Sequence, residues 1–330
     1  MTGFEKLGVK LSASDEATLT SCSHPLSTQV LQYRTAAKTV AAIKGLLDHV
    51  LGDGKIHAQF HPLGNNTGRF SSRNPNLQQV SRGQVRECFV ASAPDRALVV
   101  ADYPQIELRV AALLAEDAVM LKAFRSGEDL HQATAAAILS KGPQDISTQD
   151  RQLAKAVNFG FLYGQGAPGF RRYAKTFYGV DLTDKEATYY RWKFFGRYQQ
   201  LALWYDEAWA KAGNTDPAIA QGARTVLGRL LMAGGSSDWA KFQLHTNYVV
   251  QGSAADLIKV AMVNLSRLLP AECYLVATVH DELLLDVPLT MAEEIRSLSA
   301  AVMEAAFNEV FSTKLPIKVE AKVCSNWAEK

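Results

Sequence analysis

Two carboxylate groups stand at the ends of apolar, β-rich runs that lie far apart in the chain. Asp102 ends the run that begins at Ala97, and Asp281-Glu282 interrupts a second run over residues 277–285. An ionised carboxylate beside buried strands is costly unless a cation or hydrogen bonds compensate it. If the two ends meet in space, they form an oxygen-rich site that suits Mg²⁺. Two ions held in this way can clamp both oxygens of an in-line phosphoryl displacement.

The composition is that of a soluble globular protein. The 330 residues are 48% hydrophobic and 21% charged, which argues against bulk disorder, and the length allows about two domains. A net charge of +2 does not decide whether the partner is a nucleic acid. The four cysteines lack metal-ligand spacing, so we expect reduced thiols. The N-terminus has no apolar signal region and no apolar run could span a bilayer, so we expect a cytoplasmic protein with no membrane partner.

The order of expected elements is strands, then a helical block, then strands again. In the first part of the chain we expect a helix over 27–51, a Gly/Asn/Ser-rich basic stretch over 55–86 and a buried strand at 97–102. The middle part is expected to be mainly helical over 105–175 and 184–213. In the last part we expect a strand near 224–232, a long helix over 238–268, a β pair over 274–287, a helix capped by Thr290 and Glu293 that ends near 311, and a strand over 315–323. This order predicts an α+β fold in which a helical domain is inserted into a sheet-containing body.

One predicted helix carries a pattern that suits a nucleotide. Arg151, Lys155, Phe159 and Tyr163 recur every four residues and therefore form one stripe. The two cations lie in the first turns, where free N–H groups add positive potential for a polyphosphate. The two aromatic rings follow and could contact a sugar and a base. A solvated basic helix with a half-buried aromatic face explains the same segment equally well.

Other polar residues carry weaker signals. Glu107 either lines a pocket or complements the helix dipole near the start of its helix, and His131 either contacts phosphates or is an ordinary surface residue. The loops at 67–72 and 75–79 are rich in Arg, Asn and Gln, which suit groove edges and phosphates, but self-satisfied surface turns fit them too. The segment 251–256 has small residues at which another backbone could approach.

Two motifs mislead when they are taken alone. Residues 164–169 fit the dinucleotide fingerprint G-x-G-x-x-G, but they follow a helix instead of a strand, and Pro168 sits where a helix should begin. A nicotinamide oxidoreductase is therefore a remote alternative. His57 and His61 lack the adjacent Glu of a zinc-protease motif and lie in an expected strand.

Taken together, these segments resemble the family A DNA polymerases, the bacterial DNA polymerase I group. Residues 102–109 resemble motif A of that family, residues 151–164 resemble motif B, and Val279-His280-Asp281-Glu282 resembles motif C. The Thr-Gly-Arg loop, the Pro-Asn-Leu-Gln run, the His131 segment and the Gln-Gly-x-Ala-Ala-Asp segment also match in order, over roughly residues 30–330. The resemblance implies an α+β right-hand polymerase fold, with an antiparallel palm sheet and inserted helical fingers. Residues 1–51 would be an N-terminal segment and thumb base, 52–110 the first part of the palm, 111–221 the fingers and 222–330 the second part of the palm.

The resemblance also implies a role for each site residue. Two Mg²⁺ ions, with Mn²⁺ as an alternative, would be bound by Asp102, Asp281 and the Tyr103 carbonyl, and the catalytic residues would be Asp102, Asp281, Glu282 and Lys155. The incoming dNTP would contact Tyr103, Gln105, Glu107, His131, Arg151, Lys155, Phe159 and Tyr163. Glu107 would crowd the 2′ position and so favour deoxyribose. Primer–template DNA would contact Arg69, Asn76, Gln78, Asn247, Gln251 and His280.

The sequence departs from the family pattern in three ways. Pro104 replaces the usual Ser of motif A and removes a backbone N–H, which we expect to tune the site without abolishing it. Lys241-Phe242-Gln243 replaces a pattern that often contains Arg. An exonuclease domain and most of a thumb are not recognised. We therefore expect no proofreading and a weak, salt-sensitive grip on DNA.

The expected function is template-directed addition of deoxynucleotides to a primer 3′-OH by two-metal phosphoryl transfer. The alternatives are the polymerase subunit of a split replicase and a single-subunit RNA polymerase relative. An accessory protein that supplies a thumb, clamp or exonuclease is an expected partner. The expected location is the cytoplasm of a bacterial or phage-infected cell, near the nucleoid.

Overall fold

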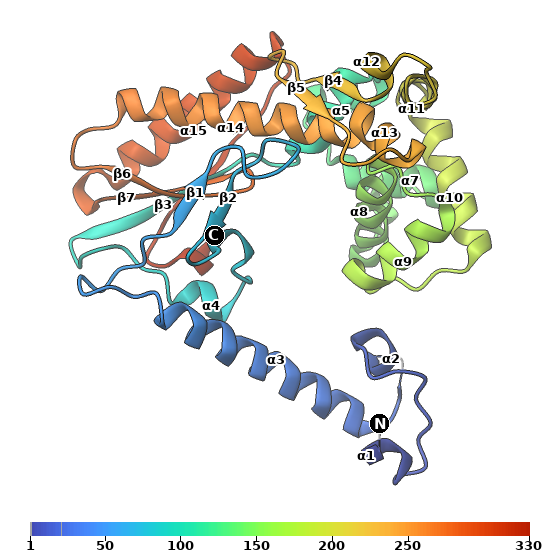
Figure 1. The fold of residues 1–330 in the computed structure, drawn as a ribbon, viewed down its shortest axis with the longest axis horizontal. Helices are drawn as coiled ribbons and strands as arrows, with labels where there is room; N and C mark the ends of the chain where they lie inside the picture. The colour runs from blue at the N-terminus through green and yellow to red at the C-terminus, as the bar shows by residue number, and fades with distance from the viewer. Residues whose placement is uncertain (1, 21) are drawn as a thin grey trace.

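Four antiparallel strands form the central sheet of the fold, in a computed structural model that describes residues 2–20 and 22–330 (Figure 1). Their spatial order is β6 (Tyr274–Val279), β7 (Glu282–Pro288), β3 (Arg96–Asp102) and β8 (Glu320–Cys324). The predicted α+β class, the strand at 97–102 and the β pair are confirmed. The register places Asp102 opposite Glu282 on β7.

Both faces of the sheet are covered, which explains the nearly continuous apolar sequence of β3. Val99 and Ala101 point into the larger core, where α15 (Ala292–Phe311) packs on β3 and β8. Behind α15 lie α14 (Val249–Leu268) and α5 (Ile106–Leu114). Successive side chains of a strand alternate between faces, so that Leu98 and Val100 join a second cluster on the opposite face, with Leu284, Cys324 and Trp327.

Short elements cover this second face. The 3₁₀ turn Leu77–Gln79 contacts β6, and α4 (Gln84–Glu87) contacts the 3₁₀ turn Trp327–Glu329. A separate hairpin of β1 (Gln59–His61) and β2 (Ser71–Arg73) precedes them and bears the Thr67-Gly68-Arg69 loop at its end. These elements bring the residues of the two predicted polar loops to the open end of the sheet.

A block of helices lies beside the sheet (Figure 1). Its members are α6 (Ala118–Ser126), α7 (Leu130–Leu139), α8 (Thr148–Leu162), α9 (Ala167–Tyr178), α10 (Asp184–Arg197), α11 (Gln199–Ala212) and α12 (Pro217–Ala220), with a 3₁₀ turn at Pro143–Asp145. Aromatic rings fill its core: Phe161 lies 4.4 Å from Phe170 and 5.5 Å from Phe194 between ring centroids. The predicted helical block is therefore confirmed, and the stretch predicted as helical over 184–213 is broken at Tyr198, whose ψ of 70° is not helical.

The predicted long helix over 238–268 is confirmed: it runs without a break through α13 (Asp238–Gln243), a π-helical turn at Leu244–Tyr248 and α14. Three details of the sequence prediction are wrong. The strand predicted near 224–232 is a hairpin of β4 (Gly222–Arg224) and β5 (Leu230–Met232), which turns at Gly228 with a φ of +83°. No capping box forms before α15, because a 3₁₀ turn at Leu289–Met291 leads into it. The last strand begins only at Glu320, since the buried, alternating residues from Leu315 to Val319 have no strand partner.

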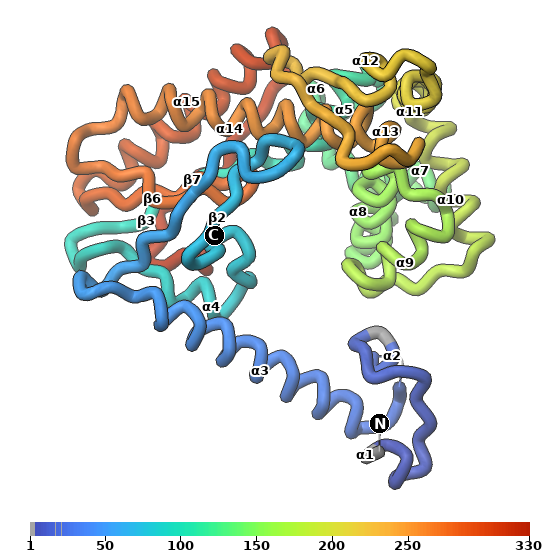
Figure 2. The backbone as a smooth tube through the Cα atoms, in the orientation of Figure 1, coloured from blue at the N-terminus to red at the C-terminus, as the bar shows by residue number. Residues whose placement is uncertain are grey.

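The N-terminal part of the chain extends away from the sheet. Figure 2 shows α3 (Pro25–Leu47) running from below the sheet to the small helices α1 (Thr2–Glu5) and α2 (Glu16–Thr20). The predicted helix is confirmed, but its apolar stripe has little cover from the described residues: Tyr33, Val40 and Leu47 are exposed. In the part of the chain that the structure describes, no helix is both long enough and apolar enough to cross a membrane.

Candidate functional site

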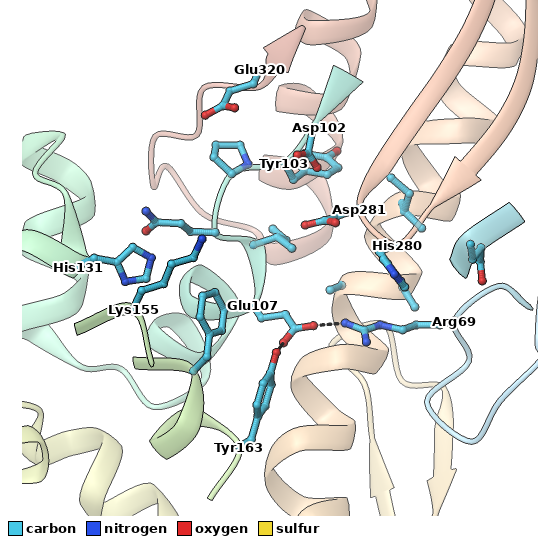
Figure 3. A pocket seen from close by; sticks show the side chains of 18 of the residues that line it. Arg69, Asp102, Tyr103, Glu107, His131, Lys155, Tyr163, His280, Asp281 and Glu320 are labelled. Atoms are coloured by element: carbon cyan, nitrogen blue, oxygen red, sulfur yellow. Dashed lines mark hydrogen bonds and ion pairs between the residues drawn. The ribbon is translucent and has the colours of Figure 1, made fainter. Parts of the chain in front are cut away.

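One cavity of about 620 Å³ lies between the end of the central sheet and the helical block, and Figure 3 shows its lining. It brings together thirteen of the predicted site residues: Arg69, Gln78, Asp102, Tyr103, Gln105, Glu107, His131, Arg151, Lys155, Phe159, Tyr163, His280 and Asp281. These residues come from five separate stretches of sequence: 69–78, 102–107, 131, 151–163 and 280–281. The fold therefore assembles, in one place, groups that sequence spacing alone could not show to be neighbours.

Asp102 and Asp281 are neighbours at the sheet end of the cavity. Asp102 ends β3, and Asp281 lies in the two-residue turn that joins β6 to β7, beside the paired ends Asp102 and Glu282. The backbone N–H of Tyr103 donates to the carbonyl oxygen of Asp281 over 3.3 Å and fixes the two strand ends together. Burial and the neighbouring Asp102 carboxylate raise the pKa of Asp281 to about 7. Burial also raises the pKa of Asp102.

A lysine that sequence reasoning missed compensates part of this negative charge. The Lys330 ammonium forms an ion pair with Asp102 and donates to the Glu282 carboxylate over 2.6 Å. Glu282 also accepts from the indole N–H of Trp327 at 2.5 Å and lies 3.5 Å from Arg86. Glu282 is thus buried below the cavity, does not line it and is already fully paired. No local sequence signal connects Lys330 to Asp102, because strand pairing alone brings them together.

The stripe on α8 faces the cavity, not bulk solvent. Arg151 forms an ion pair with Asp129 at 2.6 Å, and Lys155 points into the cavity (Figure 3). Phe159 packs 5.7 Å from the His131 ring and 6.2 Å from the Tyr163 ring, between centroids. A capping box of Ser147 and Asp150 begins the helix. The cations and aromatic rings therefore follow one another along one wall of the cavity.

Glu107 lies at the centre of a small hydrogen-bonded group. Its carboxylate accepts from the Tyr163 hydroxyl over 2.7 Å and pairs with the Arg69 guanidinium. Figure 3 shows this chain of three side chains, which crosses from β2 and its loop to the end of α8. Because both partners hold it, the Glu107 side chain is fixed where it projects into the cavity. The alternative role, complementing only a helix dipole, does not account for these contacts.

The loop that bears Arg69 is held by a second arginine that sequence reasoning also missed. Arg229 pairs with Asp256 at 2.7 Å and donates to the carbonyl oxygens of Thr67 and Gly252. A Cβ at Gly252 would lie 3.1 Å from the Thr67 carbonyl oxygen. The predicted close approach of another backbone to this segment is therefore confirmed. The signal that could have found Arg229 is its place directly after the turn at Gly228.

Several predicted residues lie outside the cavity or face away from it. Asn76 accepts from the backbone N–H of Gln78, and the Gln251 amide donates to Asn247 over 2.7 Å. The Tyr103 ring is buried and its hydroxyl donates to the Met303 carbonyl, so that only its backbone can act in the cavity.

The glycine-rich segment 164–169 does lead into a helix, α9, and Pro168 lies in the first turn of that helix, so the expectation that Pro168 would prevent a helix from beginning there is wrong. The segment still follows α8, so the dinucleotide motif lacks its strand.

Comparisons with known proteins now identify the family. The family model described as "DNA polymerase family A" matches residues 4–329. The chain is 34% identical over 303 residues to DNA polymerase I of Aquifex aeolicus, which covers 91% of this chain and 50% of that protein. It is 35% identical over 335 residues to the thermostable DNA polymerase I of Thermus filiformis, covering 98% of this chain and 39% of that protein. The chain belongs to DNA polymerase family A.

A solved structure supports the same assignment. The polymerase domain of Pol1 from M. smegmatis, in complex with DNA primer-template and dNTP, superposes with a TM-score of 0.83 at 30% identity. The match covers 95% of this chain and 56% of that one. The predicted right-hand polymerase fold is therefore confirmed. The chain spans about half the length, or less, of the curated relatives it matches.

The residues of this family A chain fit the metal ions that the family implies. The Asp102 Oδ1 atom is buried and has no hydrogen-bond partner, so it is open to a ligand. The Asp281 carboxylate lies beside it, and the raised pKa values of both buried acids indicate too little positive charge around them, which a hard cation would supply. Among the described residues no group of three or more His, Cys, Asp or Glu forms a metal site. The ligands that the family resemblance implies, Asp102, Asp281 and the Tyr103 carbonyl, would therefore need further ligands from substrate or water.

We expect Asp281 to make a contribution to the stability of the metal-free protein that falls as pH rises from about 4 to about 7. In this range the folded state keeps a proton on Asp281, whose pKa is about 7, while the unfolded state has lost it. This group alone therefore lowers the free energy of unfolding by on the order of 4 kcal/mol over the range, whereas His131, whose pKa burial lowers to about 4, acts in the opposite direction. Urea unfolding of the wild type and of Asp281→Asn at several pH values, in the presence of a chelator, isolates the contribution of Asp281. The free energy of unfolding of the variant should rise relative to that of the wild type as pH rises, and a difference that is independent of pH would contradict this origin.

We expect Lys330→Met to destabilise the metal-free protein. The substitution removes the cation that pairs with Asp102 and Glu282, and a half-buried pair of this kind is worth about 2 kcal/mol, between the surface and buried cases. Thermal unfolding in chelator measures the loss, and Mg²⁺ should restore part of it. The matched control is the exposed Lys318→Met, which should unfold like the wild type. Equal stability of the Lys330 and Lys318 variants would show that the pair contributes nothing.

Proposed function

We propose that the chain is a template-directed DNA polymerase that adds deoxynucleotides from dNTPs to a primer 3′-OH. One observation carries the proposal: the Asp102–Asp281 pair and the cationic and aromatic stripe of α8 line the same cavity. The relatives support it, because they are named as DNA polymerases and one was solved with primer-template and dNTP.

The side chains of α8 and α7 would bind the nucleotide in order. Arg151 and Lys155 supply positive charge for the triphosphate, and His131 lies beside them. Phe159 and Tyr163 form a flat wall for the sugar and the base. Glu107, fixed by Tyr163, crowds the position of a 2′ substituent. This order leaves the α-phosphate facing the two aspartates at the end of the sheet.

The aspartates would hold the divalent ions, Mg²⁺ or Mn²⁺. When bound by Asp102, Asp281 and the Tyr103 carbonyl, these ions supply the positive charge that lowers the pKa of the 3′-OH and neutralises the leaving pyrophosphate. The N–H of Tyr103 holds the Asp281 backbone in register with β3. Lys330, Trp327 and Arg86 hold Glu282 in place directly behind Asp102. The protein thus keeps the two carboxylates preorganised before substrate arrives.

DNA would lie across the end of the sheet near Arg69, Gln78 and His280, which line the cavity. Asn247 and Gln251 lie beyond it on α14 and the π-helical turn, and Asn76 caps the 3₁₀ turn that carries Gln78. Phosphate contacts from such residues weaken with salt.

Primer extension by the purified chain tests the proposal. A labelled primer on a defined template is incubated with Mg²⁺ and one dNTP at a time, and the expected product grows only with the complementary dNTP. A parallel series with NTPs separates this reading from an RNA polymerase relative. Added salt should reduce extension strongly. Absence of extension at every salt and protein concentration would overturn the proposal for the isolated chain.

Three expectations remain predictions. The chain is not expected to proofread, and shortening of the labelled primer without dNTPs would contradict this. An accessory protein is expected to raise extension, as for the subunit of a split replicase, and extension unchanged by any added protein fraction would contradict this. Location in a bacterial cytoplasm near the nucleoid is the third expectation.

A further inference from the structure

A buried chain of hydrogen bonds leads from the core of the helical block to His131. Asn158, on α8, is fully buried and its Nδ2 lies 2.7 Å from His131 Nδ1. Its Oδ1 accepts from the Thr134 hydroxyl over 2.9 Å, and that hydroxyl lies 2.7 Å from the hydroxyl of Tyr198. All four side chains are at most 2% exposed. Such a network fixes side-chain orientations when each member is satisfied.

The direction of each hydrogen bond follows from the chemistry of its atoms. The amide nitrogen of Asn158 can only donate, so His131 Nδ1 must accept. Burial raises the pKa of Tyr198, whose hydroxyl therefore stays protonated and can donate to Thr134. The Thr134 proton is shared between Asn158 Oδ1 and the Leu130 carbonyl, which it approaches to 2.7 Å. With the Thr134 proton on Asn158 Oδ1, the amide of Asn158 is held with its nitrogen toward His131.

We propose that Asn158 is a positioning residue that holds His131 in the neutral tautomer with its proton on Nε2, aimed at a phosphate oxygen of the incoming nucleotide. The identification of the acceptor as a nucleotide phosphate rests on the proposed function, whereas the tautomer does not. His131 lines the cavity beside Arg151 and Lys155, which is where a triphosphate would lie. A neutral imidazole offers only one N–H, so the tautomer decides whether a donor or a lone pair faces that anion.

The charges around His131 support a neutral ring. Burial is the largest effect and lowers the pKa of His131 to about 4; Asp129 opposes it, and Arg151 and Lys155 each add a smaller effect in the same direction as burial. At pH 7 the ring therefore cannot present two N–H groups. Without the Asn158 amide, no hydrogen bond to Nδ1 would favour one His131 tautomer over the other. The reverse orientation of the Asn158 amide would place the proton on Nδ1 and aim a lone pair at the phosphate, which is the competing arrangement.

Nuclear magnetic resonance of the wild-type chain, labelled with ¹⁵N-histidine, tests the tautomer without DNA or nucleotide. Long-range ¹H–¹⁵N correlations at pH 7.5 report which ring nitrogen carries the proton, and the His131→Gln variant assigns the signal by its loss. The expected result is a proton on Nε2 and an unprotonated Nδ1. A proton on Nδ1 in the wild type overturns the proposal, whether or not the chain extends primers.

Two variants test the role of the amide. Asn158→Asp replaces the donor by an acceptor, so His131 Nδ1 should gain a proton in the spectrum. Asn158→Leu keeps the approximate shape and leaves the two tautomers about equally populated, so the fraction of His131 rings that offer the Nε2 proton should fall about twofold and KM for dNTP should rise by about that factor, with little change in kcat. The exposed Asn308→Leu on α15 is the matched control for an Asn-to-Leu change, with wild-type KM and tautomer. Unchanged KM in Asn158→Leu, with an unchanged fold by circular dichroism, would contradict the positioning role. If extension fails in the wild type while Nε2 carries the proton, the proposed function fails and the tautomer assignment stands.

Discussion

Asp281→Asn should abolish primer extension while the protein stays folded, and Asp102→Asn should do the same. Each change removes one of the two carboxylates that would bind divalent ions beside the 3′-OH. We expect the rate to fall at least about a thousandfold, because the charge of phosphoryl transfer would then be left without compensation. Single-turnover extension with a labelled primer at saturating dNTP measures the loss.

The fold should survive because Asn resembles the protonated form of these acids. The raised pKa of Asp281 shows that a neutral side chain is tolerated there when no metal is bound. The same variants should lose Mn²⁺ binding in a titration without DNA, which separates a metal role from a purely structural one. The exposed Asp95→Asn is the matched control for an Asp-to-Asn change and should extend normally. Near wild-type extension by either site variant would remove the metal assignment.

The strand ends were predictable from sequence because both obey local rules. A run of apolar residues followed by a carboxylate can be recognised without tertiary information: Asp102 ends β3, and Asp281 lies in the turn that follows β6. The spacing of four residues on α8 likewise fixes a helix face without any tertiary information. Such features depend on the backbone period alone. Local sequence patterns therefore suffice to predict the two aspartates and the α8 stripe as candidate site residues.

The residues that support the site were not predictable in this way. Lys330 reaches Asp102 only because β8 pairs with β3, and Arg229 reaches Thr67 only because a hairpin folds back on α14. Each of these contacts spans more than one hundred residues of sequence and has no periodic signal. The same reason explains the missed hairpin: Gly228 breaks an apolar run that otherwise reads as one strand. The pairing of distant segments, and not the local propensity of the sequence, therefore determines where these side chains lie.

Glu107→Ala should lower the discrimination of dNTP against NTP. In the structure the carboxylate is held by Tyr163 and Arg69, so it cannot easily move away from a 2′-hydroxyl. Removing it opens space, and steric discrimination of this size is worth about tenfold to a hundredfold. The measurement is the ratio of kcat/KM values for dGTP and GTP opposite the same template base. Discrimination should fall mainly through a higher kcat/KM for GTP, although loss of contacts also lowers that for dGTP.

Two further variants decide whether volume or charge acts in this discrimination. Glu107→Gln keeps the size of the side chain but weakens its pairing with Arg69, so a steric role predicts that most discrimination remains. Tyr163→Phe keeps the ring and removes the hydroxyl that donates to Glu107, so the carboxylate should be less firmly held and discrimination should fall only in part. If Gln lowers the ratio as much as Ala does, charge is the cause. If the Ala variant shows an unchanged ratio, Glu107 does not select the sugar, and its fixed position between Tyr163 and Arg69 serves only to join the two walls of the cavity.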